Sequence, residues 1–224
     1  ILAERGYRGH SPSAPTNIKS ASKSVIATLA GIAIERGVLR GVNQRIAPLL
    51  RTDVPADADP RIEEITVGHL LSMQAGLRPT SGSVYGQWVA GRNWVRGVLG
   101  QPFEDDPGGR MLYSTGSSHL LSALLSVATG RSSLANARDW LDAVEGFSIA
   151  AWERDPQGIY LGGNEMAMSP RSLMAFGEVW RREGLAGDRA RTRIFPRSWV
   201  EQSWTPRTAS RWSGDGYGYG WFLR

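Results

Sequence analysis

The sequence predicts a two-lobed α/β (α+β) domain, with strands at the two ends of the chain and helices between them. An apolar helix begins near Ser20. Helix signals and loops alternate from Gly37 to Tyr160, where strand signals are few. The final stretch, residues 217–224, alternates aromatic residues with glycine and then becomes apolar, as a strand entering a sheet does. The 224 residues are 41% hydrophobic and 21% charged, which is typical of one globular domain with a sizeable core.

The distribution of charge argues against a nucleic-acid partner. The net charge is +5 and the isoelectric point about 10, but the cations, all arginines except Lys19 and Lys23, are scattered among acidic residues. Nucleic-acid binders instead concentrate positive charge on one face. The longest apolar run, from Val25 to Ile34, is about half of the ~20 residues that a membrane span requires. We therefore expect no nucleic-acid partner and no membrane span.

The residue types also limit which catalytic groups and cofactors the chain can use. The chain has no cysteine, which excludes a disulfide, a thiolate metal site and a cysteine nucleophile. Its histidines and acids show no metal-ligand spacing, so we expect no metal and no other cofactor. Catalysis would then depend on hydroxyls, amines, carboxylates or the three histidines.

The first expected elements are a short strand over residues 1–9 and a buried helix that follows a proline-rich loop. From Ser20 to Arg36 there is no proline, apolar residues recur at helical spacing, and Gly37 occupies the position just after the helix end. Small residues on the remaining faces indicate that this helix is buried on nearly all sides. We expect it at the centre of the core.

Three further helices have clear start or stop signals. A helix over residues 67–74 follows the N-cap candidate Thr66. A leucine-rich helix covers residues 117–130 and ends at a glycine. The third begins with proline directly after the N-cap Ser169 and covers residues 170–184.

A serine and a lysine lie one helical turn apart at the start of the buried helix. The three-residue offset in Ser20-Ala21-Ser22-Lys23 places Ser20 and Lys23 on one face, so a neutral Lys23 amine can take the proton of the Ser20 hydroxyl. The positive end of the helix dipole suits a developing oxyanion, and with burial it lowers the pKa of a nearby ammonium. The pattern predicts a nucleophile and its base.

A tyrosine precedes the leucine-rich helix, in Leu112-Tyr113-Ser114-Thr115-Gly116. A lone tyrosine in such a loop can be a core residue whose hydroxyl bonds the backbone. Beside a serine and lysine pair, a phenol held partly ionised by the lysine can act as general base or carry a proton to the leaving group. Tyr113 is therefore a candidate catalytic residue, and the core interpretation stays open beside it.

Several stretches, taken together in their order and spacing, carry a resemblance that covers most of the chain. They are residues 17–24, 31–39, 65–72, 113–115 and 168–173. In these stretches the sequence resembles the serine β-lactamase-related hydrolases of the class C type, a family that also includes DD-peptidases, carboxylesterases and amide hydrolases. The resemblance implies an acyl-enzyme mechanism without metal or cofactor. In that mechanism Ser20 is the nucleophile, Lys23 its proton acceptor or electrostatic partner, and Tyr113 a second general base.

The resemblance also implies a β-lactamase/transpeptidase-like fold. We expect a single domain over residues 1–224, with an antiparallel sheet lobe flanked by helices (residues 1–37 and 161–224) and an all-helical lobe (residues 38–160). The active site would lie between the two lobes and act on a small-molecule ester or amide or on a peptide. A penicillin- or peptidoglycan-recognising domain that binds or acylates without turnover is the alternative. A noncatalytic paralogue is a second alternative.

Two departures from the family pattern change what we expect of the substrate preference and of the oxyanion donors. The second motif of the family usually has asparagine two residues after its tyrosine, where the amide holds a carbonyl of the substrate, and here Thr115 stands there. A hydroxyl cannot present the donor and acceptor pair of an amide. We therefore expect Thr115 to be a substrate-binding residue in an enzyme that prefers small esters or amides to cephalosporins.

The third family motif, Lys-Thr-Gly or His-x-Gly on a sheet strand, is missing from the sequence. No lysine follows Lys23, and none of the histidines has glycine two positions on. The resemblance assigns one of the two oxyanion N–H donors to that strand. This chain would therefore supply only the other donor, which lies at Ser20. We expect residues upstream of Ile1, and a further segment beyond Arg224 or a second chain that completes the sheet.

A Ser-His-Asp triad is the alternative catalytic arrangement for a serine hydrolase, and it would use one of the histidines. His69 and His119 each lie inside an expected helix beside leucines, and no Gly-x-Ser-x-Gly sequence is present to partner them. We interpret both as hydrogen-bonded structural residues. The nine tryptophans are mostly core and loop anchors, of which one or two would wall a substrate cleft.

Overall fold

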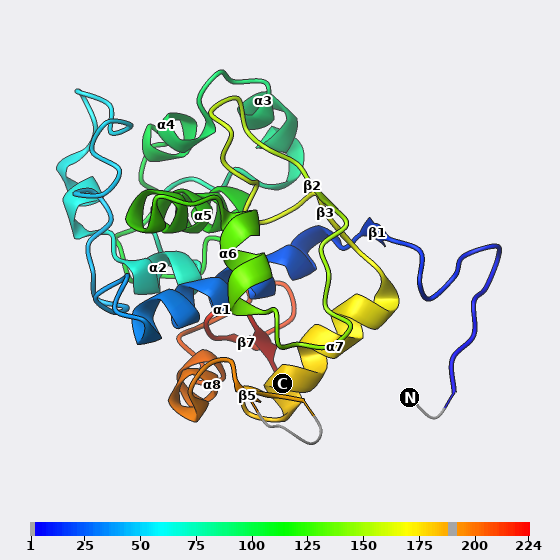
Figure 1. Cartoon of the computed structure of the whole chain (residues 1–224). Coiled ribbons are helices and arrows are strands. Elements are labelled where there is room, and N and C mark those ends of the chain that lie inside the picture. Colours follow the sequence, from blue (N-terminus) through cyan, green and yellow to red (C-terminus); the bar gives the residue numbers. More distant parts are fainter. Residues whose placement is uncertain (1–2, 188–191) are drawn as a thin grey trace.

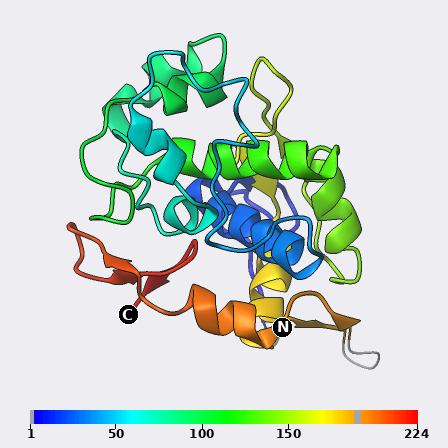
Figure 2. The ribbon, with the colours of Figure 1, turned by 90° about the vertical axis from the view of Figure 1, so that its left-hand side faces the viewer.

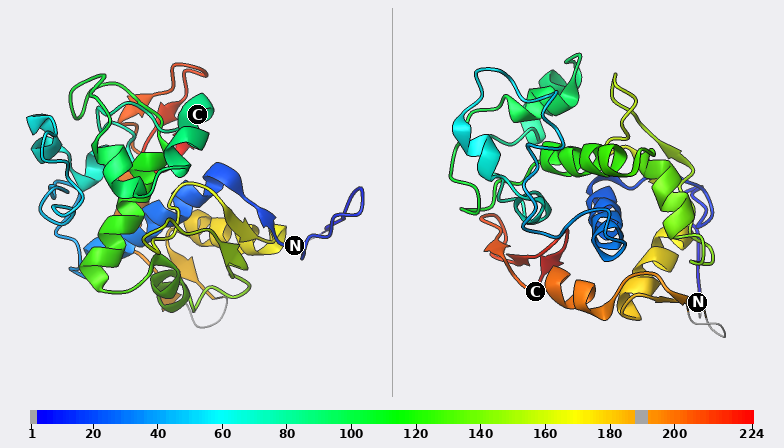
Figure 3. Two further views of the ribbon diagram at one scale, coloured as in Figure 1. Left: turned by 90° about the horizontal axis from the view of Figure 1, so that it is seen from above. Right: turned by 60° about the vertical axis from the view of Figure 1, so that its left-hand side comes forward.

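The computed structural model describes residues 3–187 and 192–224 (Figure 1). Helix α1 (Ser22–Glu35) follows a short 3-10 helix, Lys19–Ala21, and lies at the centre of the molecule. Its apolar residues from Val25 to Ala33 are buried, and Figure 3 shows it nearly end-on inside a ring of other elements. The expectation of a helix buried on nearly all sides is confirmed.

The other helices surround α1 or pack beside α5, which contacts α1, α2 and α4. They are α2 (Val67–Leu71), α3 (Tyr85–Val89), α4 (Trp94–Leu99), α5 (Thr115–Thr129), α6 (Ser133–Trp140), α7 (Pro170–Arg181) and α8 (Arg197–Ser203). Short 3-10 helices cover Pro60–Glu64 and Gly82–Val84. A side chain at Gly31 would overlap the indole of Trp199, so glycine is what allows α8 to approach α1 closely.

The predicted caps are present. The Thr66 hydroxyl accepts the His69 N–H at the start of α2, and the Ser169 hydroxyl accepts the Ser172 N–H ahead of Pro170 in α7. Gly130 ends α5 in the left-handed conformation that favours glycine. Helices α2 and α7 end earlier than expected, at Leu71 and Arg181.

Within the described residues, three small antiparallel sheets complete the mixed helix and sheet fold. Their strands are β1 (Thr16–Asn17), β2 (Ala151–Trp152), β3 (Met166–Met168), β4 (Leu185–Ala186), β5 (Thr192–Arg193), β6 (Thr208–Ala209), β7 (Gly216–Tyr217) and β8 (Phe222–Leu223). The sheet beside the start of α1 has the order β1-β3-β2, with Thr16 opposite Met168. Strand β2 lies inside the range expected to be helical. The expected combination of helices with antiparallel sheet is confirmed.

Both ends of the chain differ in detail from the expected strands. Residues 3–9 of the expected first strand form no strand, because this arm has no neighbouring strand to pair with, and residues 1–2 lie outside the described part. An ion pair between Glu4 and Arg171 ties the arm to α7. The expected strand at residues 217–224 instead forms most of a hairpin, from the last residue of β7 to β8. Strand β8 folds back on β7 through a turn that contains Gly220, whose φ is +80° (Figure 2).

Strand β8 pairs with β7 alone among the described strands. The pairing of the C-terminal end with a further strand stays a prediction. None of the described helices combines the length and the apolar character that crossing a bilayer demands.

Candidate active site

The structure brings Ser20 and Lys23 together at the start of α1. The Lys23 Nζ lies 3.1 Å from the Ser20 Oγ, as the three-residue offset predicts. The Ser20 side chain is exposed, whereas Lys23 is 2% exposed. The Ser20 hydroxyl is therefore accessible to a substrate, whereas the neighbouring Lys23 amine is buried.

Lys23 has no carboxylate partner among the described residues. Its Nζ donates to the Gly163 carbonyl oxygen at 2.7 Å and lies 3.4 Å from the Thr115 Oγ1. Burial lowers the pKa of the Lys23 ammonium to about 7, because neutral partners do not compensate the lost hydration of a charge. Near neutral pH a large share of the lysine is a free amine, which can accept a proton.

Tyr113 also lies near the serine. Its side chain lines the same cleft as Ser20, and its ring lies 5.0 Å from the Lys23 Nζ. Burial nevertheless raises the pKa of the Tyr113 phenol, so it is protonated at neutral pH. The expectation that Lys23 holds this phenol partly ionised is wrong for the resting site, because an amine with a pKa of about 7 carries only part of a charge there.

Thr115 stands at the first residue of α5 and joins Lys23 to a neighbouring loop. Its Oγ1 lies 3.0 Å from the Ser81 Oγ, which also accepts the Thr115 N–H at 2.8 Å. No sequence motif marks Ser81. Together these contacts hold the Thr115 hydroxyl beside the amine.

A glycine pair positions the carbonyl that binds Lys23. A side chain at Gly162 would overlap the Ser118 carbonyl, and one at Gly163 would lie 3.1 Å from the Lys23 Nζ. Because both positions are glycine, the backbone of this segment can lie in direct contact with α5 and with the Lys23 amine. The next residue, Asn164, therefore lies close to the site.

The segment just before Ser20 is held in an uncommon conformation. Lys19 has φ +52° and Glu165 has φ +53°, both in the left-handed region. Asn17 donates to Glu165 and accepts the Lys19 N–H, and the Lys19 ammonium lies 3.7 Å from the Glu165 carboxylate. Such strain is characteristic of functional sites, where the surrounding contacts maintain it.

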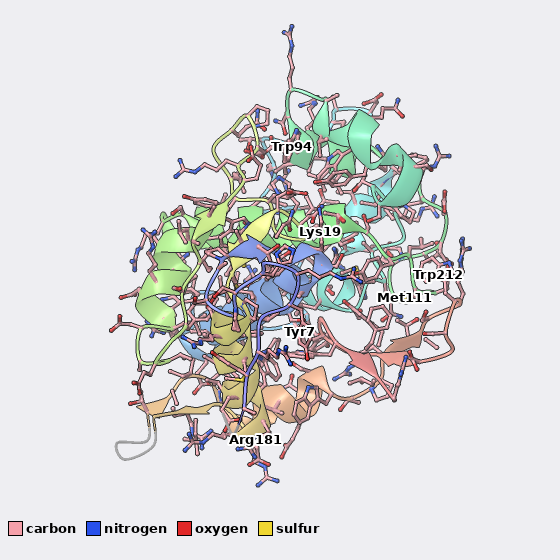
Figure 4. All side chains as sticks on the ribbon, turned by 90° about the vertical axis from the view of Figure 1, so that its right-hand side faces the viewer. Tyr7, Lys19, Trp94, Met111, Arg181 and Trp212 are labelled. Atoms are coloured by element: carbon pink, nitrogen blue, oxygen red, sulfur yellow. The ribbon has the colours of Figure 1, made fainter. Side chains whose placement is uncertain are left out.

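A cleft of about 670 Å³ opens above Ser20. Its walls include three of the four expected site residues, Ser20, Tyr113 and Thr115, while Lys23 lies beneath them. The other lining residues are Pro79, Ser81, Gly82, Tyr85, Glu104, Met111, Leu112, Asn164, Arg211 and Trp212. In Figure 4, Met111 and Trp212 lie at the same edge of the molecule. The volume suits a small-molecule substrate.

The histidine interpretation is confirmed for both helical histidines. The His69 Nδ1 accepts the Thr66 N–H in the cap of α2. The His119 ring bonds the buried Asp155 carboxylate at 3.0 Å, between Trp88 and Trp94. Neither histidine lines the cleft of Ser20.

The sequence reasoning missed the contribution of residues 162–164. The only signal in the sequence was the pair of adjacent glycines. Such a pair indicates that the backbone comes close to another part of the molecule, but it does not indicate which part. Trp212 was also missed as the tryptophan of the cleft wall. Six tryptophans are buried, as expected: Trp88, Trp94, Trp140, Trp152, Trp180 and Trp199.

Known structures share this fold at low sequence identity. The octameric penicillin-binding protein homologue from Pyrococcus abyssi is 19% identical with a TM-score of 0.70, over 95% of this chain and 54% of that one. A D-stereospecific amidohydrolase from Streptomyces is 17% identical with a TM-score of 0.70, over 93% of this chain and 70% of that one. Simvastatin synthase from Aspergillus terreus is 16% identical with a TM-score of 0.68, over 95% of this chain and 69% of that one.

The chain thus spans about half the length of the Pyrococcus protein. No curated protein matches the sequence. The sequence pattern of the beta-lactamase family matches residues 2–224, which include every residue of the site described above. Since this match extends over nearly the whole chain and agrees with the shared fold, the chain belongs to the beta-lactamase family.

Proposed function

We propose that this chain is a serine hydrolase that forms an acyl-enzyme on Ser20 with an ester or amide substrate. The observation that carries the proposal is the Lys23 amine, 3.1 Å from the Ser20 hydroxyl, with a pKa of about 7. An uncharged buried lysine beside an exposed serine is the arrangement that general-base activation of a hydroxyl requires. The hydrolase activities of several proteins with this fold support the same class.

In the acylation step, the Ser20 oxygen attacks the substrate carbonyl as its proton passes to Lys23. The tetrahedral oxyanion is stabilised by the backbone N–H of Ser20 at the positive start of the helix. Collapse of the intermediate breaks the bond to the leaving group, which takes the proton of the Tyr113 hydroxyl. The new ammonium of Lys23 lies 5.0 Å from the Tyr113 ring, close enough to stabilise the phenolate that results.

In the deacylation step, the Tyr113 phenolate takes a proton from a water molecule that attacks the acyl carbon. Lys23 then returns its proton to the Ser20 oxygen as the ester bond breaks. Both side chains end in their starting protonation states, so the cycle consumes one water and releases one acid. Thr115 positions the Lys23 amine through its own contact with Ser81.

We place this chemistry between a sheet lobe (residues 1–37 and 161–224) and a helical lobe (residues 38–160). The lining of the cleft supports the division. Ser20, Asn164 and Trp212 come from the first set of residues, and Ser81 and Tyr113 come from the second.

Incubation with a fluorophosphonate tests the proposal directly. We expect the intact mass to increase by one phosphonyl group and peptide mapping to place it on Ser20, since Ser20 alone combines exposure with a neutral amine. Label on Ser114 or Ser148 would contradict the assignment. A parallel incubation with a penicillin separates the alternatives, because a stable adduct without product indicates a domain that acylates without turnover.

Thr115 is expected to set the preference between esters and β-lactams. The wild-type protein should show a kcat/KM for p-nitrophenyl acetate above that for a chromogenic cephalosporin, because a hydroxyl cannot hold a lactam side-chain amide as asparagine does. Thr115→Asn should raise the value for the cephalosporin several-fold, in line with one added hydrogen bond. A wild-type protein that favours the cephalosporin by tenfold would overturn this argument.

A further inference from the structure

One face of α5 is polar although it is buried. Four polar residues recur there at the spacing of a single helix face, and none is more than 5% exposed: Thr115, Ser118, His119 and Ser122. A buried polar face is stable only where other residues supply its hydrogen-bond partners. Residues 153–163, which follow β2, pack against this face and include Gly163, whose carbonyl binds Lys23.

Residues 153–163 form a hairpin loop that returns to α5. The Ser122 hydroxyl donates to the Tyr160 carbonyl at 2.6 Å, and the backbone of Gly162 lies directly against α5. Gly163 comes next in the chain and ends the loop. The position of its carbonyl relative to the buried amine therefore depends on how the hairpin loop is held against α5.

A buried histidine and a buried carboxylate tie the turn of this hairpin loop to the helix. The His119 Nε2 lies 3.0 Å from the Asp155 Oδ2, and both side chains are fully buried. The Asp155 Oδ1 accepts the N–H groups of Gln157 and Ile159, at 2.9 and 2.8 Å. Within the described part of the chain, His119 is the one side chain that donates to this carboxylate.

Two tryptophans fix the orientation of the His119 ring. The rings of Trp88 and Trp94 each lie 5.7 Å from it, and the Trp88 indole donates to the Trp94 carbonyl at 3.0 Å. A carboxylate accepts but does not donate, so the His119 Nε2–H is the donor to Asp155. The Nδ1 is buried and has no partner among the described residues, so the ring has no other bond to exchange for this one.

We propose that His119 and Asp155 are a positioning pair, which keeps the Gly163 carbonyl on the Lys23 amine and keeps water away from that amine. The inference rests on the proposed acyl-enzyme function and adds two residues that do not line the cleft of Ser20. Without the His119 donor, the Asp155 carboxylate would be a buried charge with no side-chain partner, which is strongly destabilising. The hairpin loop would then move toward water and carry Gly163 away from the amine.

The effect of this movement on Lys23 has a definite sign. Burial is what lowers the pKa of Lys23 to about 7, so contact with water raises the pKa. Two other titratable groups belong to the same site: the Tyr113 ring lies 5.0 Å from the Lys23 Nζ, and the Glu165 carboxylate pairs with Lys19. Both groups are present in every variant compared below. A displaced loop therefore moves the reactivity of Ser20 to higher pH.

The pH dependence of phosphonate labelling provides the test, because the labelling rate follows the fraction of neutral Lys23 amine. His119→Phe keeps a ring between Trp88 and Trp94 but removes the donor to Asp155. We expect this variant to raise the midpoint of the pH profile by about one unit, the usual size of a shift caused by a changed environment. His119→Gln restores an N–H donor and should return the midpoint to the wild-type value.

Two further variants make the test specific. If His119→Phe does not fold, Asp155→Asn replaces it, since its oxygen still accepts the loop N–H groups. Its NH2 group leaves either tautomer of His119 with a donor that lacks an acceptor, so the midpoint should again rise. The matched control is Ser172→Ala in α7, which removes two buried hydrogen bonds to Ser148 outside the cleft and should keep the wild-type midpoint.

The outcomes separate this inference from the function on which it rests. A wild-type midpoint in folded His119→Phe, with Ser20 still labelled, would overturn this inference alone. An equal rise in Ser172→Ala would also overturn it, because the midpoint would then follow any lost buried contact. A wild-type Ser20 that stays unlabelled at every pH would overturn the acyl-enzyme function and this inference with it.

Discussion

Ser20→Ala is expected to abolish phosphonate labelling and to lower esterase activity by at least about 10³-fold, the scale seen when a catalytic nucleophile is removed. The Ser20 hydroxyl accepts from the Lys23 Nζ and caps no helix, since neither the 3-10 helix nor α1 has a side-chain hydrogen bond at its start. Removing it should cost less than ~1 kcal/mol of stability. The melting temperature should therefore change by only a few degrees, as measured by circular dichroism.

A serine in the first turn of α1 supplies the control. The Ser24 hydroxyl donates to the Gly220 carbonyl at 2.8 Å and does not line the cleft. Ser24→Ala should keep the label on Ser20. Labelling that survives in Ser20→Ala, or that disappears in Ser24→Ala at an unchanged melting temperature, would show that Ser20 is not the nucleophile.

Lys23→Met is expected to remove a dependence of stability on pH as well as the activity. The pKa of Lys23 is about 7 in the folded protein and near 10.5 when the chain is unfolded. Between these values the unfolded state binds more protons, so the free energy of unfolding rises with pH by ~1.4 kcal/mol per unit. From pH 7.5 to 9.5 the wild-type protein should gain about 3 kcal/mol, and Lys23→Met should gain none from this group.

Urea unfolding at several pH values measures the effect. Lys19→Met is the control, because Lys19 is the other lysine of the chain and is exposed, so the slope should remain. The acylation rate of the wild type should rise as the pH passes through about 7, where Lys23 becomes neutral. A wild-type free energy of unfolding that is flat across this window would mean that Lys23 stays charged in the fold.

The central helix and the proximity of Ser20 and Lys23 could be predicted from the sequence because both depend on local spacing. Apolar and small residues from Val25 to Ala33 leave no polar face, and such a helix is stable only when it is surrounded. An offset of three residues places Ser20 and Lys23 on one face whatever the rest of the chain does. The caps at Thr66 and Ser169 are local for the same reason.

The strands were predicted less well, because a strand is defined by its partner. Residues 3–9 have strand-like composition but no neighbouring strand, and they form an arm instead. The stretch at residues 217–224 meets β7 and turns at Gly220 to become a hairpin. Whether a stretch of strand-like composition pairs, and with what, depends on the neighbour that the fold provides.

By itself the sequence determined the buried helix, its caps and the serine and lysine on one face, since each follows from neighbours within a turn or two. Only the tertiary structure decided the protonation of the site. The neutral surroundings that lower the pKa of Lys23 come from Gly163 and Thr115, and the burial that keeps the phenol of Tyr113 protonated also comes from distant segments. Only the fold brings Ser81, Tyr113 and Asn164 to the cleft of Ser20, because hydrogen bonding and desolvation depend on distances in space between residues far apart in the chain.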